Sequence, residues 1–257
     1  MSNRLRCCVL LLAGATCAFL APGFVSAAVV PVVNGGFEDI SGEAPFNEFT
    51  FGPLNGWDLY DPGGITGGGA GGTFFIGTLM PSPPTFFDSV PEGDRVGIAF
   101  NNFGSGGLGE YGLQQTLAAT LQANTRYDLS VEIGNIASGT ANNGSFFNLD
   151  GFPGYRIDLL AGGQIVAQDN NTLAGSIGEG QFATSQLQFD VGAMHGQLGQ
   201  PLSIRLVNLN QVDATAPLAD LEVDFDNVRL TATSVPEPGM ASLIVIAATL
   251  LVSRRRR

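Results

Sequence analysis

The sequence contains no lysine, and all eleven of its basic residues are arginines. Two arginines precede residue 10, and four occupy the last four positions. All 23 acidic residues lie between Glu38 and Glu237, a stretch that contains only five arginines. Because so acidic a surface repels phosphate groups, the charge argues against nucleic acids and anionic membrane surfaces as partners, whereas divalent cations are compatible with it.

Cysteine and histidine are equally scarce. The three cysteines all lie within the first 17 residues, which excludes disulfides, thiolate zinc sites and cysteine nucleophiles from the rest of the chain. His195 is the only histidine, so a Ser–His–Asp triad would have to use it, but no Gly-x-Ser-x-Gly motif accompanies it and the sequence gives catalysis of this kind little support. A carboxylate pair for glycoside hydrolysis stays open, although nothing in the sequence singles one out.

Long apolar runs occur only at the two ends of the chain. Residues 1–27 have the pattern of a secretory signal peptide, with Arg4 and Arg6 followed by the apolar stretch Val9–Leu20 and then by small residues. We therefore expect an exported protein whose mature part begins at Ala28.

The C-terminal residues 235–257 join three features in a fixed order. Two prolines make the first part extended, an apolar stretch over 240–252 follows, and arginines close the chain. The apolar stretch is shorter than the roughly 20 residues that a stable transmembrane helix needs. The hinge consists of Pro236, Glu237 and Pro238, and the basic tail of Arg254, Arg255, Arg256 and Arg257.

This order resembles the PEP-CTERM sorting signal. The resemblance implies a short transmembrane helix over 240–252, transient insertion into the inner membrane, and cleavage by an exosortase-type membrane protease. It also implies delivery to the surface or the extracellular matrix of a bacterium. A simple tail anchor is the alternative interpretation.

Between the two ends, residues 28–234 predict one all-β domain. Frequent glycine turns and the absence of a sustained helical period favour an antiparallel β-sandwich, and the Gly162-Gly163 pair predicts a tight hairpin. The predicted strands are Arg95–Phe100, Gly112–Leu117, Tyr127–Gly134, Tyr155–Leu160, Gln164–Gln168, Gln186–Val191, Leu202–Leu206 and Leu221–Thr231.

The last predicted strand changes phase. Its apolar residues fall on odd numbers up to Phe225 and on even numbers from Val228 onward. A strand with one buried face needs an extra residue to change phase in this way, so a β-bulge is predicted at Asp226-Asn227. The alternative is a strand that is buried on both faces near its end.

Both ends of this domain resemble jelly-roll domains of the carbohydrate-binding and galactose-binding-like kind. The resemblance rests on the run from Asn34 to Glu38, on Gly56-Trp57, and on the run from Asp224 to Leu230. It implies a jelly-roll-like sandwich in which the first and last strands are neighbours. It also implies a structural Ca²⁺ held by Glu38 and Asp226, with Asp224 as a further candidate ligand. The alternative is that these acids are solvated strand ends.

Three aromatic residues could stack on a sugar ring, namely Trp57, Tyr60 and Tyr111. A lone tryptophan in a sandwich more often packs in the core, whereas Tyr111 lies between glycine-containing segments and is expected to be exposed. The sequence thus predicts a non-catalytic surface or matrix protein that binds polysaccharide. The alternative is a secreted hydrolase that acts on envelope polysaccharide.

Overall fold

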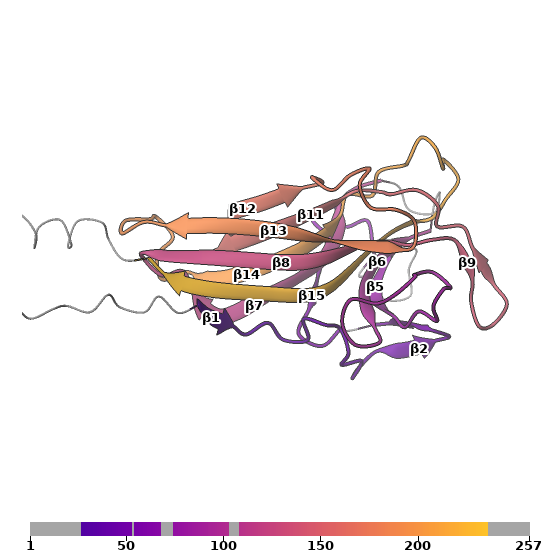
Figure 1. The fold of residues 1–257 in the computed structure, drawn as a ribbon, viewed down its shortest axis with the longest axis horizontal. Helices are drawn as coiled ribbons and strands as arrows, with labels where there is room; N and C mark the ends of the chain where they lie inside the picture. Colours follow the sequence, from indigo (N-terminus) through magenta and orange to yellow (C-terminus); the bar gives the residue numbers. More distant parts are fainter. Residues whose placement is uncertain (1–26, 53, 68–73, 103–107, 236–257) are drawn as a thin grey trace, which may run out of the picture.

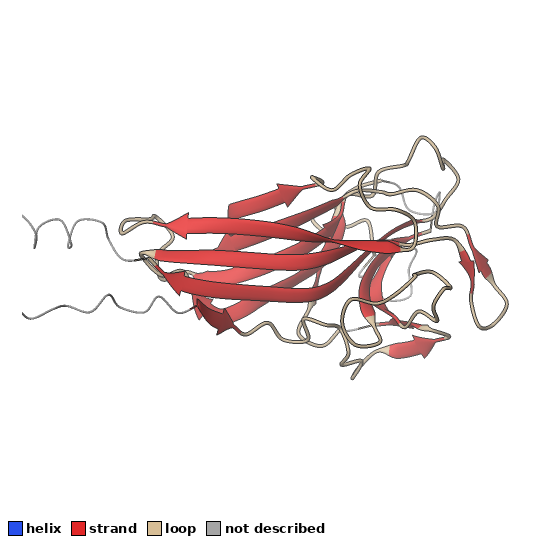
Figure 2. Cartoon of the chain, in the orientation of Figure 1, coloured by secondary structure: helices blue, strands red, loops and turns tan. Residues whose placement is uncertain are grey.

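The computed structural model describes residues 27–52, 54–67, 74–102 and 108–235. Within these ranges the regular elements are strands, and no helix is long and apolar enough to cross a bilayer. The strands form two antiparallel sheets that pack face to face (Figure 2), which confirms the predicted all-β sandwich. The signal peptide and the C-terminal features at 236–257 lie outside the described residues.

The larger sheet has eight strands in the order β13-β8-β15-β6-β5-β3-β2, with β1 paired to β15. Its strands are β1 (Ala27–Val30), β2 (Ala44–Phe46), β3 (Phe49–Phe51), β5 (Phe74–Leu79), β6 (Val96–Asn101), β8 (Thr125–Asn135), β13 (Gln181–Val191) and β15 (Leu221–Ser234).

The smaller sheet has five strands in the order β12-β11-β14-β7-β4, and β9 and β10 form a separate hairpin. These strands are β4 (Asp58–Tyr60), β7 (Tyr111–Thr120), β9 (Gly139–Thr140), β10 (Phe146–Phe147), β11 (Tyr155–Ala161), β12 (Gln164–Asn170) and β14 (Pro201–Asn208). Gly162 and Gly163, both at positive φ, form the predicted tight turn between β11 and β12.

The long strands β8, β13 and β15 lie side by side along the long axis of the molecule (Figure 1). In β8 the odd-numbered side chains from Tyr127 to Ile133 are buried, and the even-numbered ones between them are half-buried, as the alternation predicts. At the opposite end from β1, the strands β2, β5 and β9 and several loops gather around the start of β15 (Figure 1). This end of the sandwich carries the site described below.

Strand β15 confirms two of the predictions. Its register with β8 shifts between Asp226 and Arg229, and Asn227 has a φ of 50°, so the predicted bulge is present. Its later residues pair with β1, for example Ala27 with Thr233, so the first and last strands are neighbours. Its first residues, Leu221 to Phe225, pair instead with β6.

Two separate apolar clusters stabilise the fold. The first lies between the sheets and combines side chains of both, such as Val223 and Phe225 of β15 with Leu206 of β14. The second contains residues of the larger sheet and of the loops that cover its outer face, but none of the smaller sheet. Its buried members are Phe49, Leu79, Phe86, Phe87, Val96, Ile98, Phe100, Ile136, Ala141 and Leu149. The outer face of the larger sheet is therefore shielded from solvent where these loops cover β3, β5 and β6.

The eight strands predicted from residue 95 onward are all present: β6 has its predicted length and is shifted by one residue, and the other seven are longer than predicted. The sequence did not predict β2 to β5. Strands β2, β3 and β4 have three residues each, which is too short to distinguish from a loop, and β5 lies between a glycine-rich and a proline-rich segment. Tyr111 was wrongly expected to be exposed: β7 begins at this residue, and its fully buried ring points into the core between the sheets.

Candidate active site

Two acidic side chains stand next to each other at the start of β15. Glu222 pairs with Phe100 of β6, and Asp224 pairs with Ile98. Since directly paired residues of an antiparallel ladder point to the same side, both acids share the face of these two apolar partners. Ile98 and Phe100 belong to the second apolar cluster, so both carboxyl groups point into it.

Both carboxyl groups are removed from water. Asp224 is 0% exposed and Glu222 is 2% exposed. Within the described part of the chain, no other group donates a hydrogen bond to their four carboxyl oxygens, so the two carboxyl groups can bond only to each other through a shared proton. A buried carboxylate without a partner is very unfavourable, so these groups take up protons.

The pKa values follow from this surrounding. Burial, and then the charge of Asp220, raise the pKa of Glu222 to about 8. Burial, and then the charge of Glu222, raise the pKa of Asp224 well above its usual value. At neutral pH the pair therefore carries carboxylic protons in an apolar surrounding, which is the state of a general acid.

Aromatic loop residues close the site from outside. Phe86 and Phe87 belong to the loop between β5 and β6, and both are buried. Backbone hydrogen bonds fix this loop, from Ala137 N–H to the Phe86 carbonyl at 3.0 Å and from Asp88 N–H to the Gly180 carbonyl at 2.9 Å. Phe87 also packs on Phe182 of β13, with 4.5 Å between the ring centroids. The acids thus lie between the sheet and an aromatic cover.

A polar frame holds the start of β15 against the smaller sheet. The side-chain amide of Asn208 donates to the carbonyls of Ala99 and Leu221, at 2.8 and 3.2 Å, and to the Tyr111 hydroxyl at 3.2 Å. Burial, followed by the charge of Glu222, raises the pKa of Tyr111 well above its usual value. The predicted site residue Tyr111 therefore lies within electrostatic reach of the acid pair.

The predicted calcium ligands are brought only partly together. The Glu38 carboxylate accepts the N–H groups of Asp94 and Arg95 at 2.8 and 2.9 Å, and Asp226 accepts those of Glu92 and Asn227 at 2.8 and 2.6 Å. Burial, together with the charges of Glu92 and Glu38, raises the pKa of Asp226 to about 7.

Glu38 and Asp226 both accept N–H groups of the same short segment, Glu92 to Arg95, so the two carboxylates lie at one loop, and the charge of Glu38 contributes to the raised pKa of Asp226. The third candidate ligand, Asp224, faces the second apolar cluster. Over residues 27–235, apart from the gaps given above, no three His, Cys, Asp or Glu side chains form a metal-binding cluster.

The other predicted ligand-binding aromatics have partners within the protein. Trp57 is buried, stacks on Phe37 at 5.5 Å, and donates its indole N–H to the Asn34 carbonyl at 3.1 Å. Tyr60 donates to Glu110 at 2.7 Å, and the Arg205 guanidinium lies 4.0 Å from the centre of its ring. Both rings are therefore engaged by other residues of the protein, and none of these contacts involves Glu222 or Asp224.

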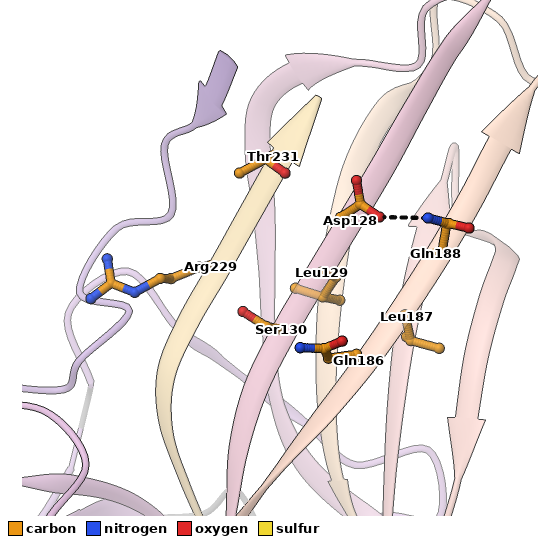
Figure 3. Close-up of a pocket in the computed structure, with 8 residues that line it drawn as sticks. All are labelled: Asp128, Leu129, Ser130, Gln186, Leu187, Gln188, Arg229 and Thr231. Atoms are coloured by element: carbon orange, nitrogen blue, oxygen red, sulfur yellow. Dashed lines mark hydrogen bonds between the residues drawn. The ribbon is translucent and has the colours of Figure 1, made fainter. Parts of the chain in front are cut away.

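A groove of about 550 Å³ lies on the outer face of β13, β8 and β15, near the middle of these three strands (Figure 3). Its polar side chains come from the three strands, and Gln188 donates to Asp128 at 3.0 Å. The remaining lining residues are Leu129, Ser130, Gln186, Leu187, Arg229 and Thr231. This groove holds no buried acid, and His195, which packs against Phe189, does not line it.

The sequence drew attention to Asp224 but not to Glu222. The available signal was the alternation of acids with apolar residues from Leu221 to Asp226. Burial of both faces, which the sequence left open only as an alternative and near the end of the strand, occurs at its start and buries these acids. Nothing local to this strand indicates that its acidic face is covered.

Comparison with known proteins identifies relatives over almost the whole described region. The family model described as HpiC1-like, HpiC1 cyclase, matches residues 28–231. A crystal structure of a cyclase from Fischerella sp. TAU is 38% identical, covers 82% of this chain and 100% of its own, and superimposes with a TM-score of 0.69. A comparison with curated proteins found no match.

Two further structures carry ligands. A Stig cyclase, Fisc, from Fischerella sp. TAU, in complex with (3Z)-3-(1-methyl-2-pyrrolidinylidene)-3H-indole, has the same identity, coverage and TM-score of 0.69. A cyclase from the same organism in complex with 4-(1H-indol-3-yl)butan-2-one is 37% identical, covers 82% of this chain and 100% of its own, and has a TM-score of 0.67.

Proposed function

Because this chain belongs to the HpiC1-like cyclase family, we propose that it is an enzyme that closes a ring on an indole-bearing small molecule. The observation that carries the proposal is the pair of carboxyl groups of Glu222 and Asp224, which are buried at an apolar, aromatic cluster where burial raises their pKa values. Such a site is suited to protonate carbon and to protect the cation that results.

Family membership overturns the prediction of a non-catalytic, PEP-CTERM-sorted surface protein with a carbohydrate-binding body, since the relatives are cyclases. The alternative of a hydrolase acting on polysaccharide is wrong for the same reason. An exosortase and a polysaccharide were the predicted partners; indole-derived small molecules, the ligands of two Fischerella cyclases, take their place.

The proposed step balances without any external reagent. A carboxylic acid donates its proton to one carbon of a side-chain alkene, which forms a C–H bond and leaves a cation on the neighbouring carbon. The electron-rich indole ring attacks this cation, and a carbon–carbon bond forms. The ring carbon then returns a proton to the carboxylate, so the acid is regenerated and the product is an isomer of the substrate.

We assign the proton donation to Asp224. It is the more deeply buried of the two acids, and its neighbours in the ladder are Ile98 and Gly134. Glu222 lies next to it on the same face and, through its own proton, keeps a second negative charge away from the donor.

The experiment uses an indole with an isolated alkene on its 3-substituent, and 4-(1H-indol-3-yl)butan-2-one as a binding probe. Wild-type protein should bind the probe and yield a cyclised isomer of unchanged mass. Asp224→Asn should lower kcat by about 10²–10⁴-fold, the typical contribution of general acid catalysis. Asp190→Asn, which removes an exposed partner of Arg126, is the matched control. The proposal would be refuted if the wild-type protein neither bound the probe nor formed an isomerised product.

Two further features belong to this proposal. We propose that the sandwich has jelly-roll connectivity, supported by the pairing of β1 with β15. We also propose that the enzyme is exported, supported by the basic start and apolar stretch of residues 1–27. N-terminal sequencing of the protein from its native source tests the export, and a first residue other than one near Ala28 would contradict it.

A further inference from the structure

One row of side chains crosses the larger sheet at the acid site. Phe182 of β13 pairs with Gly134 of β8, Gly134 pairs with Asp224 of β15, and Asp224 pairs with Ile98 of β6. All four positions therefore lie on the outer, covered face. Between the aromatic residue and the acid, the row has a residue without a side chain.

The Phe182 ring fills the space that Gly134 leaves. A Cβ atom at position 134 would lie 2.6 Å from Cε1 of Phe182 and 2.9 Å from Cβ of Asp224. The edge of the ring and the base of the acid thus meet above the glycine. A larger residue at 134 would push the ring away from Asp224, because contacts this short do not occur for real Cβ atoms.

Phe182 stands on the border between the site and solvent. Its side chain is half-buried, whereas Asp224 beside it is 0% exposed. Phe87 packs on the ring at 4.5 Å, and the adjacent Gly180 bonds through its N–H to the Asn135 carbonyl at 2.8 Å. The ring is therefore held at one edge of the aromatic cover, where it is itself partly exposed to solvent.

We propose that Phe182, seated on Gly134, excludes water from the cationic centre formed beside Asp224 and so decides whether the intermediate closes its ring or is hydrated. This inference rests on the function proposed above. It makes Phe182 a specificity-determining residue and assigns no proton transfer to it.

The competing outcome is a defined reaction. If a water oxygen adds to the cation, a carbon–oxygen bond forms and the water gives its second proton to the carboxylate. The product is an alcohol that is one water heavier than the substrate. The ratio of cyclised isomer to alcohol therefore measures how well water is excluded, and a residue that only supports the fold does not change it.

The test compares Phe182→Leu and Gly134→Ala with wild type, using the 3-alkenylindole and mass spectrometry of the products. The first variant shortens the side chain so that it no longer reaches Asp224, and the second displaces an intact ring. Phe189→Leu, on the same strand and also half-buried, and Gly192→Ala, whose new Cβ would meet no atom within 4 Å, are the controls.

Both test variants should lower the ratio of isomer to alcohol on the order of tenfold, while both controls keep the wild-type ratio. In the double variant the two effects should not add, because each substitution removes the same contact, that of the Phe182 ring with Asp224. Turnover with an unchanged ratio in both test variants would overturn this inference and leave the proposed function intact. Absence of any product in the wild type would overturn both.

Discussion

Glu222 and Asp224 project from the same face of β15, two residues apart, and both carboxyl groups are buried with no hydrogen-bond partner in the described part of the chain other than each other. On an ordinary strand that faces solvent this spacing would place two ionised acids in water. Here the covering loops remove the water, so the same spacing produces two acids that hold protons at neutral pH. The acid site is thus a consequence of the cover as much as of the strand.

The first prediction concerns stability. The pKa of Glu222 is about 8 in the folded protein, above that of an exposed glutamate, and that of Asp224 is raised in the same direction. Between about pH 4.5 and 8 the folded state therefore binds more protons than the unfolded state, so the free energy of unfolding falls as pH rises, by up to about 1.4 kcal/mol per pH unit for each group. Calorimetry of wild type and Glu222→Gln/Asp224→Asn should show a melting temperature that falls more steeply with pH in the wild type. Equal slopes would contradict the assignment of buried, protonated acids.

The second prediction concerns the pH dependence of catalysis. Since the protonated pair is the active form, kcat should be constant at neutral pH and decline above about pH 8, where Glu222 loses its proton. Glu222→Gln cannot ionise, so the decline of its kcat should follow the deprotonation of Asp224 alone. Because the charge of Glu222 contributes to the raised pKa of Asp224, the midpoint of this decline should differ from that of the wild type. The measurement is a kcat–pH profile with the 3-alkenylindole, and Asp190→Asn should keep the wild-type profile. A kcat that increases with pH would show that the ionised form is required.

The sequence predicts strands reliably where one face of the strand is buried and the other faces solvent. The alternation from Tyr127 to Ile133 predicts β8, and the phase break before Val228 predicts the bulge at Asp226-Asn227. Both follow from the two-residue period of a strand, which is a local property.

The acid site could not be predicted in this way. From Leu221 to Phe225 the residues alternate as they would in a strand with one wet face, so the acids read as solvated. What buries them is a second apolar cluster built from distant loops, including Phe86 and Phe87. The likeness to carbohydrate-binding domains rests on strand patterns that describe the fold, and a fold does not determine function.

Calcium binding by Glu38 and Asp226 stays a prediction from the sequence. The repulsion between them is part of what raises the pKa of Asp226 to about 7, so a cation shared by both would compete with protons. Saturating Ca²⁺ should raise the melting temperature by about 5–10 °C, taking roughly 2.7 kcal/mol at a hundredfold excess over Kd. The rise should be larger at pH 8 than at pH 6, where Asp226 is protonated.

Thermal melts with chelator and with Ca²⁺ measure this effect. Asp226→Asn and Glu38→Gln should lose the calcium-dependent rise, Asp190→Asn should keep it, and Mg²⁺ should substitute poorly because it requires a tighter octahedral geometry. Identical wild-type melting temperatures in chelator and in Ca²⁺ would show that no structural Ca²⁺ binds here, and these acids would then serve only as acceptors of backbone N–H groups.

The last prediction concerns a buried carboxylate that should stabilise the fold without taking part in catalysis. Asp169 of β12 accepts hydrogen bonds from the hydroxyl groups of Tyr155 and Ser185, both at 2.5 Å, and from the N–H of Thr172 at 3.1 Å. Tyr155 belongs to the smaller sheet and Ser185 to the larger one, so this carboxylate joins the two sheets. Although burial alone would raise it, the pKa of Asp169 is lowered by the bonds from Ser185, Tyr155 and Thr172.

Because its pKa is lowered in the folded state, Asp169 stabilises the protein above the pKa of an unfolded aspartate, about 4, and this contribution is lost as pH falls below it. Asp169→Asn should therefore cost about 1.5–3 kcal/mol at pH 7, the usual contribution of a hydrogen bond to a charged group, and much less at pH 3. Asp190→Asn, which breaks only the exposed pair with Arg126, should cost less than about 1 kcal/mol at pH 7. Denaturant titrations at both pH values measure the difference. A loss for Asp169→Asn that is the same at pH 3 and pH 7 would show that the packing of residue 169, and not its charge, holds the sheets together.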